Sequence, residues 1–178
     1  VCHSASCSFA LRLAAEQADR VSALCLLSPF DEKPAAASHP VFLLPVMCLN
    51  RIQRFMSAEF EARAFHERTR ARQTPEHVQL LETSAALSGS NPMYMCKAYY
   101  RQLQVPSSDV ISRVDVPVAL LCGEADLLAP LAGAKALHAL LPNSELHVVT
   151  NTAHQLMQED PARVNAIIEG FLRPLLCN

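Results

Sequence analysis

Two continuous apolar runs, residues 21–28 and 116–122, have the length of β-strands and lack polar alternation, which is typical of strands buried on both faces of a parallel sheet. A third strand is predicted at residues 145–150. Apolar positions recur at helical spacing in residues 4–18, where serines supply capping oxygens. Further helices are predicted at residues 131–141 and 160–172. Alternating strands and helices predict an α/β domain.

The middle of the chain has a different pattern. A polar loop at residues 31–39 leads into an apolar stretch at 40–49 that Pro45 interrupts. Residues 50–73 have helical spacing, and Thr74-Pro75 has the form of an N-cap followed by proline at the first helical position.

That second helix is expected to run through Leu87, with another at residues 92–104. We therefore expect residues 1–33 and 113–178 to form the α/β core and residues 34–112 to form a helical cap or lid inserted into it.

Composition narrows the class of protein. The 178 residues are 51% hydrophobic and 18% charged, with a formal net charge of −2. This excludes a disordered chain and indicates one domain. Because positive and negative side chains nearly balance, the net charge does not favour nucleic acid as a partner. No apolar run has the length of a membrane-spanning helix, and the first residues do not read as a signal peptide.

The seven cysteines are odd in number and widely spaced, with no C-x-x-C pair. This pattern favours free, mostly buried thiols and a reducing compartment, so we expect a cytoplasmic protein. The histidines show neither H-x-x-x-H nor H-E-x-x-H spacing, and no metal site is predicted.

Three residues that together carry a known chemistry lie at the ends of predicted elements. Ser4 opens the first helix, while Asp126 and His154 follow the second and third strands. In a parallel sheet the ligand site lies outside the carboxyl ends of the strands. Serine as nucleophile, histidine as base and a carboxylate that orients the histidine form a catalytic triad. Asp31 remains a rival for the acid.

The order Ser–Asp–His and three local motifs resemble the α/β-hydrolase-fold serine hydrolases, and among them the abhydrolase domain-containing lipid esterases. Residues 2–6 (Cys-His-Ser-Ala-Ser) correspond to the nucleophile elbow G-x-S-x-G. Residues 123–130 correspond to the acid loop G-x-x-D-x-x-x-P, and residues 151–161 to the histidine loop. The resemblance extends from Ser4 to about Leu172, with the insert in the place of the family's lid.

The chain departs from the family pattern at glycines. Cys2 and Ser6 replace both glycines of the elbow, and Ala153 replaces the glycine before the histidine. The elbow is strained, and small neighbours are needed because helix and strand approach closely there. The replacements are small, so we expect the turn to survive.

The resemblance implies roles for individual residues. Ser4 would be the nucleophile, His154 the general base and Asp126 its orienting acid, with the backbone N–H of Ala5 as one oxyanion donor and no cofactor. It also implies that the chain corresponds to the C-terminal portion of a hydrolase and begins at the elbow. On that view the strand entering the elbow, the loop with the second oxyanion donor and the first half of the sheet are missing. We expect the 178-residue chain alone to lack useful activity.

Other polar and aromatic residues have plainer interpretations. We expect His3 to pack or form hydrogen bonds at the elbow and Asp160 to cap the last helix. Tyr94, Tyr99 and Tyr100 either shape a pocket or pack the lid on the core.

The apolar start of the lid is expected to line the substrate pocket through Phe42, Leu43, Leu44 and Met47. An apolar pocket favours small-molecule acyl esters or lipids over sugars and phosphates. The adjoining arginine-rich helix is consistent with a lid packed on the pocket with solvated arginines, or with peripheral membrane contact. The sequence makes no prediction about oligomers.

The predicted function is therefore cleavage of a lipid-like acyl ester through an acyl-enzyme. Two alternatives stay open at this point. One is an acyltransferase using the same triad, with an alcohol in place of water. The other is a non-catalytic pseudo-hydrolase that binds a partner, an alternative raised by the missing elbow glycines.

Overall fold

The computed structural model describes residues 1–34 and 38–176. Its centre is a parallel four-stranded sheet in the order β1-β2-β3-β4. The strands are β1 (Cys2–His3), β2 (Leu24–Leu27), β3 (Val118–Gly123) and β4 (Ser144–Val149). The three predicted strands are confirmed. The expectation that the strand entering the elbow is missing is corrected, because Cys2 and His3 form the short strand β1, which pairs with β2.

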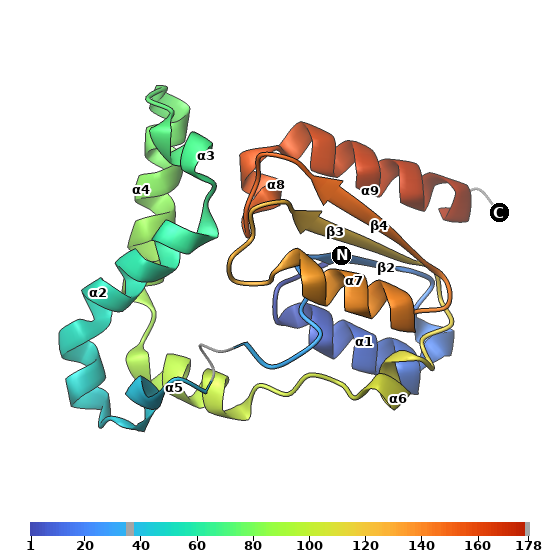
Figure 1. Cartoon of the computed structure of the whole chain (residues 1–178), viewed down its shortest axis with the longest axis horizontal. Helices are drawn as coiled ribbons and strands as arrows, with labels where there is room; N and C mark the ends of the chain where they lie inside the picture. Colours follow the sequence, from blue (N-terminus) through green and yellow to red (C-terminus); the bar gives the residue numbers. More distant parts are fainter. Residues whose placement is uncertain (35–37, 177–178) are drawn as a thin grey trace.

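Helices surround the sheet and extend beyond one end of it (Figure 1). The helices are α1 (Ser6–Glu16), α2 (Val46–Ala64), α3 (Glu67–Ala71), α4 (Pro75–Ser90), α5 (Met93–Gln102), α6 (Ser108–Ile111), α7 (Leu131–Leu140), α8 (Leu156–Glu159) and α9 (Pro161–Leu176). Short 3-10 turns lie at Ala18–Arg20 and Pro40–Leu43. The predicted start of α4 is confirmed, with Thr74 as N-cap and proline in the first turn. Leu156–Glu159, which lie within the histidine loop predicted at residues 151–161, form the short helix α8.

Each face of the sheet is covered by its own set of helices. Leu26 and Leu120 face α1, α6 and α7, where they pack against Leu11 and Leu137. On the opposite face Leu27 and Leu121 pack against residues of α8 and α9. All four residues of β2 and all six of β3 are buried. The lack of alternation in the sequence thus reflects a strand covered on both sides.

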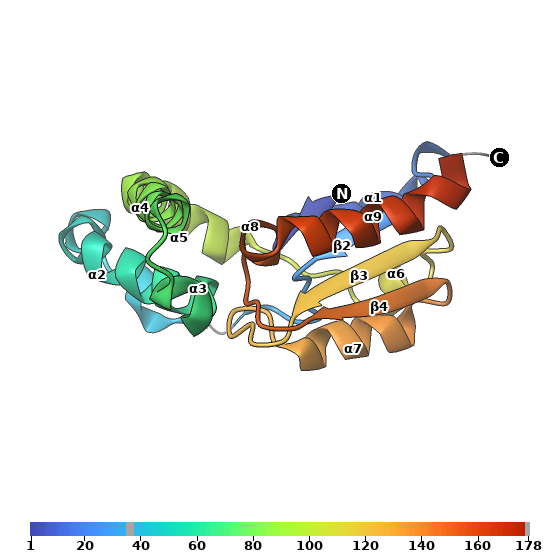
Figure 2. The same ribbon diagram turned by 90° about the horizontal axis from the view of Figure 1, so that it is seen from above.

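Helices α2 to α5 form the lid, at the end of the sheet to which the strand arrows point (Figures 1 and 2). Phe42, Leu49 and Met93 form a small apolar cluster inside it. Helix α6 lies within the range of the predicted insert and packs on the core through Ile111. None of the helices in the described part of the chain is both long and apolar enough to cross a membrane.

The cysteines among the described residues are free thiols. Cys7, Cys25 and Cys122 are buried, and burial raises the pKa of the Cys122 thiol to about 12. Cys48 is exposed at the start of the lid. Cys177 lies outside the described residues.

Candidate active site

Ser4 occupies a sharp turn between β1 and α1. Its backbone has a φ of 55°, in the left-handed region that non-glycine residues rarely adopt. The Ser4 N–H donates to the carbonyl of Leu27 (2.8 Å), and the Ser6 hydroxyl donates to the carbonyl of His3 (2.8 Å). The N–H of His3 in turn donates to Ser6 Oγ (3.0 Å). The serines were expected to cap α1, but its N-cap is Ala5 without a side-chain cap, and Ser6 closes the elbow instead.

The acid and histidine loops meet directly beyond β3 and β4. The N–H of Ala125 donates to the carbonyl of Thr152 (3.0 Å). Gly123 ends β3 so close to this loop that a Cβ there would collide with the carbonyl of Ala153. Glycine is therefore required at position 123 by the approach of the two backbones.

The structure brings Ser4, His154 and Asp126 together in one line. His154 Nε2 lies 2.9 Å from Ser4 Oγ, and His154 Nδ1 lies 2.9 Å from Asp126 Oδ2. A carboxylate only accepts, so Nδ1 carries the proton towards Asp126 and Nε2 is free to accept from the serine hydroxyl. His154 and Asp126 are buried, with 3% and 4% of their surface exposed. The arrangement has the geometry of a nucleophile, a base and an orienting acid.

Asp126 is held as a carboxylate despite its burial. Desolvation disfavours its charge, but the hydrogen bond and the attraction to His154, together with the N–H of Ala129, outweigh it and lower the pKa of the carboxyl. Asp126 Oδ1 accepts from the N–H groups of Leu128 and Ala129, both at 2.8 Å. Asp31, the rival acid, instead lies against Gly133 of α7.

His3 packs beside the line of three residues. Its Nε2–H donates to the carbonyl of His154 (2.9 Å), and the two rings are 4.8 Å apart. Ser28 Oγ donates to the same carbonyl (3.3 Å). The interpretation of His3 as a packing and hydrogen-bonding residue is confirmed. Asp160 is confirmed as a cap of α9, because its Oδ1 accepts from the N–H of Arg163.

Ala5, the expected oxyanion donor, lies directly after Ser4 at the N-cap of α1 and is buried. The first hydrogen bonds at the start of α1 are donated by the N–H groups of Cys7 and Ser8 to the carbonyls of Ser4 and Ala5. The N–H of Ala5 comes before these donors in the chain. First-turn N–H groups of a helix have no partner within the helix. The N–H of Ala5 thus belongs to the residue that follows Ser4, at the positive end of α1.

A cavity of about 520 Å³ opens between the lid and Ser4. Its floor contains His3, Ser4, His154 and Gln155. Its remaining wall comes from the lid: Phe42, Met56, Ser57, Phe60, Ser88, Asn91, Met93, Met95, Cys96, Tyr99 and Tyr100. Of the tyrosines, Tyr99 and Tyr100 therefore shape the pocket, whereas Tyr94 is exposed.

Four residues were expected to line the substrate pocket: Phe42, Leu43, Leu44 and Met47. This expectation is corrected, because only Phe42 of the four lines the cavity over Ser4. The 3-10 turn at Pro40–Leu43 directs Phe42 onto the ring of Tyr100. Leu43, Leu44 and Met47 are 79%, 42% and 75% exposed and do not reach the cavity. Instead, α2 contributes Met56 and Phe60, which lie one turn apart and which the helical spacing of residues 50–73 did not assign to a pocket.

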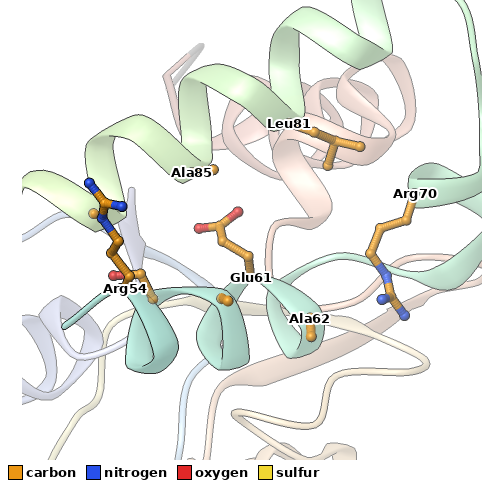
Figure 3. A pocket seen from close by; sticks show the side chains of 9 residues that line it. Arg54, Glu61, Ala62, Arg70, Leu81 and Ala85 are labelled. Atoms are coloured by element: carbon orange, nitrogen blue, oxygen red, sulfur yellow. The ribbon is translucent and has the colours of Figure 1, made fainter. Parts of the chain in front are cut away.

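A second cavity of about 510 Å³ lies between α2 and α4 (Figure 3). The carboxylate of Glu61 points into it, opposite Leu81 and Ala85 of α4. Ser57 lines both cavities, so they adjoin each other at this residue.

Metal-binding residue types do not gather in groups of three or more in the part of the chain that the structure describes. The side chains joined at Ser4 are a hydroxyl, an imidazole and a carboxylate.

Comparison with known proteins agrees with this geometry. Residues 1–167 match the Alpha/beta hydrolase family. The chain belongs to this family. As in other members of the alpha/beta hydrolase family, the strand–turn–helix around Ser4 and the loops after later strands build one site.

Three proteins illustrate the similarity. RutD of Cronobacter turicensis, named as a candidate carbamate hydrolase, is 38% identical over 64 residues, which are 36% of this chain and 24% of RutD. A thermophilic esterase from Thermogutta terrifontis superimposes with a TM-score of 0.78 at 22% identity, over 93% of this chain and 61% of the esterase. The esterase EaEST from Exiguobacterium antarcticum has a TM-score of 0.74 at 16% identity, over 93% and 63% of the two chains. The chain thus spans a quarter of the matched curated relative and about three fifths of the solved structures.

Proposed function

We propose that this alpha/beta hydrolase chain carries the nucleophile, base and acid of a serine hydrolase that cleaves carboxylic esters with a lipid-like acyl group. The observation that supports it best is the continuous hydrogen-bonded line from Ser4 through His154 to Asp126, with 2.9 Å at each contact. The left-handed turn at Ser4 adds to this, because such strain is usual where a nucleophile is presented.

The proposed reaction has two halves. Ser4 Oγ attacks the ester carbonyl carbon while its proton passes to His154 Nε2, and Asp126 stabilises the imidazolium. The N–H of Ala5 donates to the oxyanion of the tetrahedral intermediate. When the intermediate collapses, the bond to the leaving alcohol breaks and His154 protonates the alcohol. Water then gives a proton to His154 as its oxygen attacks the acyl carbonyl carbon. When this second intermediate collapses, the bond from the acyl carbon to Ser4 Oγ breaks, His154 returns the proton to Oγ, and the acid is released.

The substrate class is proposed from the lining of the cavity over Ser4. Phe42, Phe60 and Met93 contribute apolar surface, and the volume of about 520 Å³ lies in the range of small-molecule sites. An acyl chain fits such a wall, whereas a sugar or phosphate would lose hydrogen bonds to water without replacement. A long chain would reach the second cavity past Ser57.

The proposal is tested with a fluorophosphonate probe and a panel of nitrophenyl esters on the full-length protein. We expect covalent labelling that Ser4→Ala abolishes, and a loss of about 10⁴ in kcat for Asp126→Asn, the scale seen when the tautomer of a triad histidine is lost. Ser22→Ala serves as the control, because Ser22 is an exposed serine before the start of β2, at the opposite end of the sheet from Ser4. Labelling that persists in Ser4→Ala would contradict the proposal.

The similarity to RutD favours carbamates as a second substrate class. A carbamate carbonyl passes through the same tetrahedral geometry at Ser4. Adding a nitrophenyl carbamate to the ester panel separates the two: a higher kcat/KM for the carbamate of matched chain length would replace the ester as the preferred class.

A further inference from the structure

Glu159, at the end of α8, is a buried carboxylate that joins two distant parts of the chain. Its Oε1 accepts from the N–H of Ala153 (2.6 Å), the residue before His154. Its Oε2 accepts from the N–H of His66 (2.8 Å) and from Thr69 Oγ1 (2.7 Å), both in the lid. Glu159 is only 8% exposed. One oxygen therefore serves the histidine loop and the other serves the lid.

A second bond links the same two segments. The N–H of Gln155 donates to the carbonyl of Ala64 at the end of α2 (3.0 Å). Ala64 and the following Phe65 are almost fully buried, with 0% and 2% of their surface exposed. The residues on both sides of His154 are thus held, one by Glu159 and the other by the lid itself.

We propose that Glu159 is a positioning residue that aligns His154 and ties this alignment to the docking of the lid. This rests on the proposed function of the Ser4 site. The carboxylate is suited to the role because both of its oxygens accept, and the three donors around it all need an acceptor. If His66 and Thr69 of the lid move away, Oε2 loses both of these hydrogen bonds, and each donor loses its acceptor. The docked lid and the aligned histidine are therefore stabilised together.

The central test compares Glu159→Gln with a control variant, Glu169→Gln. Glu169 is an exposed glutamate on α9. The amide places an NH₂ group against either Ala153 or the lid, so one of the two arms breaks. We expect Glu159→Gln to lower kcat for a nitrophenyl ester by about ten- to a hundredfold, the effect of a shift of about 1 Å in a catalytic group. Glu169→Gln should remain within about twofold of the parent.

Thr69→Val separates the two arms, because it removes one lid donor and leaves the bond to Ala153 intact. We expect it to raise KM several-fold with kcat within about threefold of the parent. A general loss of stability would not produce this split. The Thr69→Val variant also keeps the proposal testable if Glu159→Gln does not fold. In that case, unchanged KM and kcat in Thr69→Val would overturn the coupling between Glu159 and the lid.

A readout independent of turnover is the downfield proton resonance of the His154 Nδ1–H that donates to Asp126. We expect this resonance in the parent and in Glu169→Gln, and its shift or broadening in Glu159→Gln. If the parent hydrolyses no ester but the resonance depends on Glu159, the proposed function fails and the positioning role stands. If a folded Glu159→Gln keeps both the resonance and kcat, the positioning role is overturned.

Discussion

The conformation of Ser4 is imposed by its neighbours and not by its own residue type. Pairing of His3 with Leu27 and the bond from the Ser4 N–H to the Leu27 carbonyl fix the turn from one side. Ser6, in the place of a family glycine, bonds both the N–H and the carbonyl of His3. A glycine has no hydroxyl and would make neither bond. The departure from the family motif thus replaces backbone freedom with side-chain hydrogen bonds.

A second single residue, His3, makes the free energy of unfolding depend on pH. Burial lowers the pKa of His3 below its ordinary value of 6.5, and the nearby His154 lowers it further, although the bond to the His154 carbonyl raises it. Between 6.5 and the lower folded value, the unfolded chain binds a proton that the folded chain does not. The free energy of unfolding therefore falls as the pH falls through this window.

We expect His3→Gln to remove this contribution, so that unfolding free energy declines less steeply below pH 6.5, by at most about 1.4 kcal/mol per pH unit. Urea titrations of parent and variant between pH 5 and 8 measure the difference. Parallel curves over the whole range would mean that His3 titrates alike in the folded and unfolded chains.

At the scale of elements, the site depends on how closely two loops approach after parallel strands. β3 and β4 pair in register from Val118 with Ser144 to Gly123 with Val149. Their ends therefore lie side by side, and the acid and histidine loops leave from neighbouring points. The absence of a side chain at Gly123 allows the backbone of Ala153 to pass over it.

Gly123→Ala is expected to destabilise the protein by about 1–3 kcal/mol, the usual cost of overpacking, because the new methyl group meets backbone atoms that must move. Displacement of the histidine loop should also reduce labelling of Ser4. Gly170→Ala in α9 is the matched control, since a Cβ there meets nothing, and it should stabilise by about 0.5–1 kcal/mol through helix propensity. Chemical denaturation of both variants tests this; equal effects would contradict it.

At the scale of the molecule, the two cavities of the lid adjoin at Ser57, whose hydroxyl donates to the carbonyl of Ser88 (3.3 Å). Ser57 lines both the cavity over Ser4 and the space between α2 and α4. A side chain larger than serine at this position would fill space on the border of both cavities.

We expect Ser57→Phe to reduce kcat/KM for long-chain nitrophenyl esters by about tenfold and to leave short-chain esters within about twofold. One excluded methylene is worth about 0.8 kcal/mol of burial, so two lost methylenes account for an effect of this size. Ser57→Ala adds no bulk at the border of the two cavities, so kcat/KM should depend on ester chain length as it does in the parent. A uniform loss across all chain lengths would show that acyl chains do not pass Ser57.

Local pattern was sufficient to predict three of the four strands, most helices and the three residues Ser4, Asp126 and His154 at their ends. Apolar runs without alternation identify strands covered on both faces, and Thr74-Pro75 marks a helix start because proline lacks the N–H that a first turn leaves unpaired. The rule that parallel strands present their carboxyl ends together then brings Ser4, Asp126 and His154 to one edge.

The direction of individual side chains and the bonds between distant segments were decided only by tertiary packing. Phe42 turns inward and Leu43 outward because Tyr100, far along the chain, packs on one side of their turn. Glu159 looks in the sequence like one more acidic residue before a helix. Its three donors come from Ala153 and from residues about ninety positions earlier, and only the folded chain brings them to one carboxylate. Periodicity and turn residues determine the secondary structure of a segment, because they act locally. Its tertiary contacts depend on residues far away in the sequence that the fold brings beside it.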